Sequence, residues 1–193
     1  MSKTLSLRKF IQSQLNTVSC GTNRPLICVS TEAFYGCTRL SYFDHMTVPQ
    51  PTGMVRIGDN AFAHCINLRS LPTIAYYASA IGTSAFWETG ISSATLPYAL
   101  NIPSFAFYGC NRLTYVNLSK ASMIGASAFV GCDGLVSLYL GFSSVVSLYY
   151  GVTGGFGTTN ASLKVYVPSS LVTAYKQHTS WKAISGKIAS IPT

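Results

Sequence analysis

Residues 102–118 read I-P-S-F-A-F-Y-G-C-N-R-L-T-Y-V-N-L. This stretch opens with an aliphatic residue, carries Ala-Phe at its centre and ends in an alternating segment. Near copies of it begin at Ile57, Ile81 and Ile124, and a weaker copy begins at Val29. Self-similarity at a period of ~20–50 residues is the signature of stacked repeats, so the repeat is interpreted before any local element.

The five copies agree at fixed positions. An alanine precedes each central phenylalanine, and the phenylalanines are Phe34, Phe62, Phe86, Phe107 and Phe129. The residue three positions later is Cys37, Cys65, Thr89, Cys110 or Cys132. The spacings between the phenylalanines are 28, 24, 21 and 22 residues.

A unit of this length cannot bury its own apolar face, whereas stacked copies share one continuous core. We therefore expect a solenoid in which the phenylalanines form a single buried column. The segments L-T-Y-V-N-L at 113–118 and L-V-S-L-Y-L at 135–140 alternate as half-buried strands do. Strands of successive copies are expected to pair in parallel.

The pattern I-G-x-x-A-F-x-x-C-x-x-L, best seen at residues 57–68, resembles the BspA-like class of leucine-rich repeat. The resemblance covers about Val29 to Leu140, and V-Y-V-P-S-S-L-V-T-A-Y-K at 165–176 resembles C-terminal caps of surface and phage proteins of this class. It implies a leucine-rich-repeat solenoid, with a parallel strand ladder, a short helical or irregular second side and helical caps at both ends. It implies binding, adhesion or attachment, with no catalytic residues and no cofactor.

The chain divides into a cap at residues 1–28, five repeats at 29–140, and a degenerate repeat with a C-terminal cap at 141–193. Residues 3–16 are predicted to form an amphipathic helix, and residues 17–28 an irregular segment. The helix either docks onto a neighbouring subunit or covers the first repeat. Its apolar face comprises Leu7, Phe10, Ile11 and Leu15.

The tail is expected to hold several short elements. The glycines at 154–157 favour a glycine-rich loop, because no phosphate-binding motif accompanies them. A strand is predicted at 163–167. A short helix is then expected to end near His178, with Ser169 or Ser170 as its N-cap.

Charge is concentrated at the two ends. The net charge is +8, of which residues 1–28 and 141–193 contribute +4 each, leaving a neutral centre. These ends either meet acidic partners or are solvated caps, and we favour the second interpretation. No specific nucleic-acid site is predicted, and no apolar run approaches the ~18 residues of a membrane helix.

The sequence offers little for catalysis or metal binding. The cysteines of the repeat are interpreted as buried thiols, while Cys20 and Cys28 either pair or, as we favour, stay free. No C-x-x-C or H-E-x-x-H motif is present, and the five acidic residues are scattered. We predict no enzyme, no metal site and no cofactor.

Outward side chains of the strands are the candidate binding face. Alternation that turns Leu113, Val116 and Leu118 inward turns their neighbours outward. The predicted face comprises Tyr42, Asp44, Arg69, Tyr115, Asn117, Ser137 and Tyr139, with Arg69 at the start of the second repeat's strand. A second aromatic column, Tyr35, Trp87 and Tyr108, follows the core phenylalanines, and it either binds a ligand or merely flanks the core.

These features favour a non-enzymatic attachment protein within a larger assembly, such as a phage virion appendage. The sequence begins at Met1 without a secretion signal and has extra apolar and basic elements at both ends. Expected partners are protein subunits of the assembly or a host-surface protein or glycan, and a homo-oligomer is compatible with the sequence. The alternative is a secreted or cell-surface bacterial adhesin.

Overall fold

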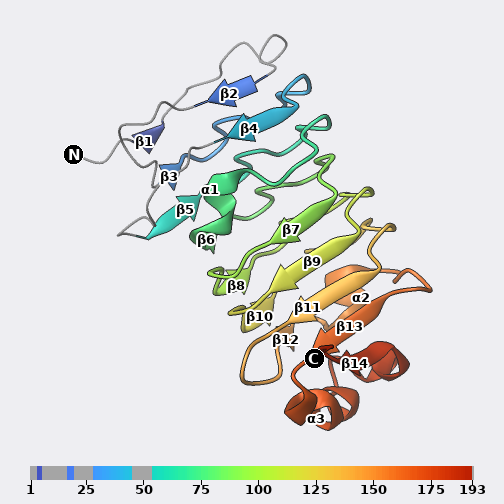
Figure 1. The fold of residues 1–193 in the computed structure, drawn as a ribbon. Coiled ribbons are helices and arrows are strands. Elements are labelled where there is room, and N and C mark those ends of the chain that lie inside the picture. The colour runs from blue at the N-terminus through green and yellow to red at the C-terminus, as the bar shows by residue number, and fades with distance from the viewer. Residues whose placement is uncertain (1–3, 6–16, 20–27, 45–53, 193) are drawn as a thin grey trace.

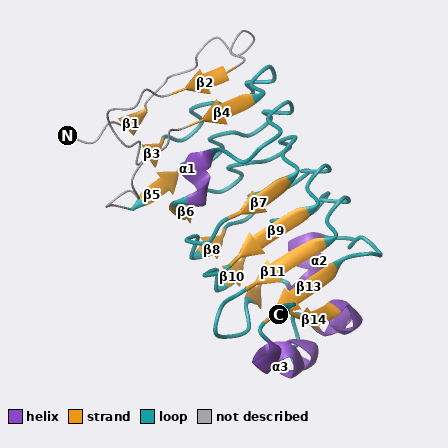
Figure 2. Ribbon diagram, viewed as in Figure 1, coloured by secondary structure: helices purple, strands orange, loops and turns teal. Residues whose placement is uncertain are grey.

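The computed structural model describes residues 4–5, 17–19, 28–44 and 54–192. Short strands lie one above another in an elongated stack, with the N-terminal strands at one end and the C-terminal helices at the other (Figure 1). Strands and loops make up most of the stack, as Figure 2 shows. The solenoid predicted from the repeat is confirmed.

One side of most rungs is a strand of a parallel ladder. The five-stranded sheet has the order β14-β13-β11-β9-β7, and β2 pairs with β4 nearer the N-terminus. These strands are β2 (Thr17–Ser19), β4 (Tyr42–Asp44), β7 (Ser93–Thr95), β9 (Tyr115–Leu118), β11 (Ser137–Leu140), β13 (Lys164–Val167) and β14 (Ile188–Ser190). In β9 and β11 every second side chain is buried, so the predicted alternation is confirmed.

A second side of the stack consists of shorter parallel strands, in the orders β1-β3-β5-β6 and β12-β10-β8. They are β1 (Thr4–Leu5), β3 (Cys28–Val29), β5 (Val55–Ile57), β6 (Ala78–Ile81), β8 (Asn101–Ile102), β10 (Met123–Ile124) and β12 (Ser147–Leu148). The aliphatic residue that opens each repeat lies at the end of such a strand and is buried.

The phenylalanines form one buried spine. Neighbouring rings are stacked with centroids 5.2–5.6 Å apart and planes within 13° of parallel. The sixth member is Phe156, from the degenerate repeat, whose centroid lies 5.2 Å from that of Phe129. Each spine contact joins adjacent repeats, which is how a stack of units acquires one continuous core.

The turns around the phenylalanines are also joined from rung to rung. The Phe107 N–H donates to the Ala128 carbonyl at 2.8 Å, and the Phe129 N–H donates to the Gly155 carbonyl at 2.8 Å. Rungs approach so closely that a Cβ added at Gly125 would lie 2.6 Å from the backbone nitrogen of Ser104. Glycine at this position therefore follows from the stacking distance.

The C-terminal segment covers the last rung. It contains η1 (Ser169–Leu171), α3 (Val172–Gln177), η2 (Lys182–Lys187) and strand β14. The buried Trp181 ring lies 6.0 Å from Phe156, and its Nε1–H donates to the Val146 carbonyl at 2.7 Å. The Val146 N–H donates to the Tyr175 hydroxyl at 2.9 Å. The predicted strand and helix of the tail are confirmed.

The N-terminal prediction is wrong where the structure tests it. Thr4–Leu5 is strand β1 rather than helix, because β3 offers it a parallel hydrogen-bonding edge. Strands β2 and β3 likewise occupy parts of the segment predicted to be irregular. The apolar residues assigned to a docking helix, Leu7, Phe10, Ile11 and Leu15, lie outside the described residues, as does the loop at 45–53.

Three local predictions also need correction. The glycine-rich segment is helix α2 (Gly151–Phe156), which carries Phe156 into the spine. Pro168 occupies the N-cap position of the tail's helical segment, and no side chain caps it. Arg69 does not begin a strand, because Pro72 has no N–H for a ladder and helix α1 (Thr73–Tyr76) follows it.

Candidate binding face

Three tyrosines from successive rungs lie together on the outer surface of β9, β11 and β13. The Tyr139 ring centroid lies 4.5 Å from that of Tyr166, with the two planes 21° apart. The Tyr115 centroid lies 5.3 Å from that of Tyr139. Parallel pairing fixes this arrangement, because β9, β11 and β13 are in register and every second residue faces outward.

Polar groups surround these rings. Asn117, level with Tyr139 in the register, donates a hydrogen bond from Nδ2 to the Tyr115 hydroxyl at 3.4 Å. Ser137 lies level with Tyr115 and Lys164. We call the outward surface formed by Tyr115, Asn117, Ser137, Tyr139 and Tyr166 the sheet face.

The Tyr139 phenol is influenced by its surroundings. Partial burial, followed by the proximity of the Tyr166 and Tyr115 phenols, raises the pKa of Tyr139 above its ordinary value. Tyr139 therefore stays a neutral hydroxyl, able both to donate and to accept a hydrogen bond, beyond the pH at which a free phenol ionises.

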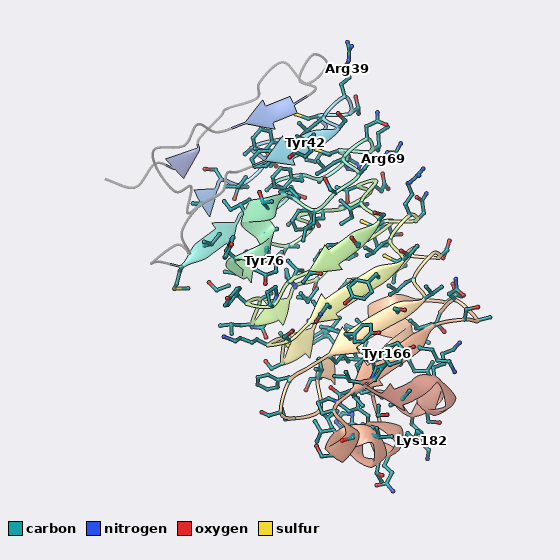
Figure 3. All side chains as sticks on the ribbon, in the orientation of Figure 1. Arg39, Tyr42, Arg69, Tyr76, Tyr166 and Lys182 are labelled. Atoms are coloured by element: carbon teal, nitrogen blue, oxygen red, sulfur yellow. The ribbon has the colours of Figure 1, made fainter. Side chains whose placement is uncertain are left out.

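The predicted residues near the N-terminus are separate from this cluster. Tyr42 is exposed on β4, and Asp44 ends the same strand. Arg69 has an exposed side chain whose Nη2 donates to Asn67 at 3.4 Å, while its carbonyl accepts from the Ser92 N–H. Figure 3 shows Tyr42 toward the N-terminal end of the stack and Tyr166 toward the C-terminal end.

Tyr166 was absent from the residues predicted for the face. The sequence carried a signal for it, because V-Y-V at 165–167 continues the alternation of 135–140 after a longer connection. The longer connection, which includes α2, hides the register until β13 is seen paired with β11.

The repeat cysteines are buried thiols. Cys65 Sγ donates to the Phe34 carbonyl at 3.1 Å, and Cys132 Sγ donates to the Phe107 carbonyl at 3.0 Å. Burial raises the pKa of Cys37 and Cys65. Cys28 is a free thiol, and Cys20 lies outside the described residues.

His64 and Glu88, from adjacent repeats, form an ion pair when the histidine is protonated. His64 Nδ1 contacts Glu88 Oε2 at 3.0 Å. Within residues 28–44 and 54–192, no group of three or more His, Cys, Asp or Glu side chains is arranged to hold a metal ion. The described part of the chain also contains no helix with the length and apolar character needed to span a bilayer.

Parallel strands stacked on a repeated buried ladder define a leucine-rich-repeat solenoid, a class that presents extended binding surfaces. The chain belongs to the BspA type leucine rich repeat region family, whose repeat matches six times within residues 28–151. Among solved structures, it is similar to a leucine-rich repeat protein from Bacteroides ovatus at 18% identity and a TM-score of 0.48. That match covers 83% of this chain and 49% of the other, so this chain spans about half the length of that protein. No curated protein matches the chain.

Proposed function

We propose that this protein is a non-catalytic attachment protein whose sheet face binds a protein partner. The observation that carries the proposal is the cluster of Tyr115, Tyr139 and Tyr166 on three hydrogen-bonded strands. Tyrosine gives a large amphipathic contact area for little loss of side-chain entropy. A rigid, parallel-paired scaffold lowers the ordering cost of binding further.

Polar groups beside the rings favour a protein partner. The Asn117 amide, the Ser137 hydroxyl and the phenols supply hydrogen bonds at the edge of an aromatic centre. Protein interfaces combine an aromatic core with such a polar rim. Tyr42 and Arg69, whose side chains are exposed, would extend the proposed contact toward the N-terminal end of the stack, so that the partner is engaged over several rungs.

Photo-crosslinking from position 139 tests this proposal. Tyr139 is replaced by a benzoyl-phenylalanine in the native host or particle, and the matched control carries the same group at Tyr150, which is 76% exposed. The expected result is one protein captured from position 139 and not from position 150. Equal capture at both positions, or capture at neither, contradicts the proposal.

The captured partner then allows a quantitative test. Truncation of a central aromatic anchor costs ~2 kcal/mol or more, so Tyr139→Ala should weaken binding about 30-fold or more. Tyr150→Ala is the control and should leave the affinity unchanged. An unchanged affinity in Tyr139→Ala would remove the sheet face from the interface.

Two locations are proposed for this attachment protein, a virion appendage and the bacterial cell surface or medium. Membership of the BspA type family supports a surface or secreted setting, and placement in a virion appendage or another larger assembly is the more specific proposal. Mass spectrometry of purified particles against cell-envelope and medium fractions separates the two. Recovery from particles supports the appendage, and recovery from envelope or medium alone replaces it with an adhesin. Native mass spectrometry gives the oligomeric state.

A further inference from the structure

A second aromatic row lies on the turn segments, outside the sheet face. Its members come from four consecutive repeats: Tyr35, His64, Trp87 and Tyr108. The ring centroids are 5.2 Å apart between Tyr35 and His64, 5.4 Å between His64 and Trp87, and 5.4 Å between Trp87 and Tyr108. The four rings are partly exposed, so the row is a surface feature.

Phe105 widens this row at an unusual backbone position. Its ring is 37% exposed and lies 6.1 Å from Trp87 and 5.8 Å from Tyr108, centroid to centroid. Its φ is +59°, a left-handed conformation that bulky side chains rarely adopt. Glu32, Asn60, Ser84 and Ser127 occupy the same left-handed position in the other repeats. The left-handed backbone is therefore a feature of the repeat, and only in this repeat does the position carry a large apolar ring that is partly exposed to solvent.

Two titratable side chains occupy another left-handed position of the turn. His64 has φ +61° and Glu88 has φ +52°, where the other repeats have Gly36, Gly109 and Gly131. The Glu88 carboxylate contacts His64 Nδ1 at 3.0 Å and accepts a hydrogen bond from Trp87 Nε1 at 3.2 Å. His64 and Glu88 therefore place hydrogen-bonding groups beside the aromatic rings, and 47% of the Glu88 side chain is exposed.

This combination matches the chemistry of a sugar chain. A pyranose ring has apolar C–H faces that pack on aromatic rings and equatorial hydroxyls that need donors and acceptors at the ring edge. The exposed carboxylate disfavours anionic groups at this position. A row that spans four repeats fits a chain of several sugars.

We propose that this row, Tyr35, His64, Trp87, Glu88, Phe105 and Tyr108, binds a neutral oligosaccharide. Trp87 and Phe105 form the platform, since their ring planes lie only 23° apart. Glu88 and His64 supply the hydrogen bonds that orient the sugar. The site is independent of the sheet face, and either proposal can fail without the other.

Binding of the full chain to a printed array of defined neutral, sialylated and sulfated oligosaccharides tests the proposal. We expect binding to neutral oligosaccharides, reduced at least tenfold by Trp87→Ala and by Phe105→Ser. The serine variant keeps the fold, because Ser84 and Ser127 occupy the same backbone position. Tyr139→Ala, on the sheet face, should bind the array as the unchanged protein does.

Intrinsic fluorescence adds a readout of the site itself. Trp87 is partly exposed and Trp181 is fully buried, so a bound neutral oligosaccharide from the array should change the emission of Trp87 alone. The change should vanish in Trp87→Ala and persist in Tyr139→Ala. Failure to bind any neutral oligosaccharide, or binding that survives both Trp87→Ala and Phe105→Ser, overturns the proposal. Loss of array binding in Tyr139→Ala also overturns it, because the sugar would then lie on the sheet face.

Discussion

Replacing Phe107 with alanine tests whether the aromatic spine holds the rungs together. The side chain is fully buried, and its centroid lies 5.3 Å from those of Phe86 and Phe129. A buried Phe→Ala substitution costs about 3–5 kcal/mol, and each lost aromatic pair contributes about 0.5–1.5 kcal/mol of that beyond area burial. Because domains are stable by only about 5–15 kcal/mol, Phe107→Ala should remove a large share of the free energy of unfolding.

Urea unfolding followed by far-ultraviolet circular dichroism measures this loss. Phe105→Ala is the matched control, since it removes the same ring from the same repeat at an exposed position. Alanine at position 105 keeps the cost of the left-handed backbone, which only glycine would relieve, by up to about 1 kcal/mol. Phe105→Ala should therefore change the free energy of unfolding little. A cost below about 1 kcal/mol for Phe107→Ala, or an equal cost for Phe105→Ala, would refute a stabilising spine.

Hydrogen exchange gives a spatial check on the same variant. In a stack, each repeat contacts only its neighbours, so the lost contacts should weaken the rungs of Phe86, Phe107 and Phe129 first. Amides of the C-terminal cap, around Trp181, should keep more of their protection. Uniform acceleration across the whole chain would show that the solenoid unfolds as one unit.

Three further changes test the packing. Gly125→Ala should cost about 1–3 kcal/mol in a urea melt, because the new Cβ would lie 2.6 Å from the Ser104 nitrogen, whereas Gly186→Ala meets nothing within 4 Å and should be neutral. Cys65, whose pKa is raised by burial, should be alkylated by iodoacetamide at least roughly tenfold more slowly in the folded protein than in urea, as read by peptide mass spectrometry. Burial also raises the pKa of Tyr175 from 10.0 to about 12. The fold therefore favours the neutral phenol, which contributes about 2–3 kcal/mol to the free energy of unfolding below pH 10. This contribution is lost as the pH rises from 10 to 12.

Each of these has an outcome that contradicts it. Equal costs for the two glycine variants would mean that the rungs are not in close contact at Gly125. Alkylation of Cys65 at the same rate in both states would place the thiol in solvent. For Tyr175, the melting temperature is followed from about pH 9 to 12, and Tyr175→Phe should fall less steeply than the unchanged protein. Parallel curves would show that the phenol does not titrate differently in the two states.

The spine could be predicted from sequence because it rests on a pattern that repeats. Phe34 to Phe129 keep their distance from an alanine and an aliphatic residue, so one register explains five copies. Phe156 breaks that spacing, because Leu148 at the end of β12 precedes it by eight residues rather than five, with α2 between them. Only the structure shows that Phe156 stacks on Phe129 and is the sixth member of the spine.

Elements without the repeat pattern were not predictable in the same way. Strands β1 and β2 contain two and three residues, too few for a periodicity to be read, and they form because neighbouring rungs offer hydrogen-bonding edges. Ser70 and Leu71 occupy the register of a strand, yet Pro72 and α1 follow directly. In both cases tertiary contacts or a single proline decide the outcome over local pattern.

The alternation of apolar and polar residues predicted that Tyr115 and Tyr139 face outward, and the structure agrees, because the aliphatic residues between the outward positions are buried. The second aromatic column was visible as Tyr35, Trp87 and Tyr108. The parts played by Phe105 and His64 could not be read from sequence, because they depend on left-handed backbone positions that bring neighbouring turns together.

The rung-to-rung hydrogen bonds join the same atoms at each step, from a phenylalanine N–H to the carbonyl of the residue before the next phenylalanine. A tandem duplication of residues 103–124 would therefore present matching groups to both of its neighbours. A gene that encodes such a stack can gain or lose whole repeats, because each added repeat makes the same core contacts as the others. The number of repeats in the gene then determines the distance between the two ends of the molecule, which changes by one rung for each repeat gained or lost.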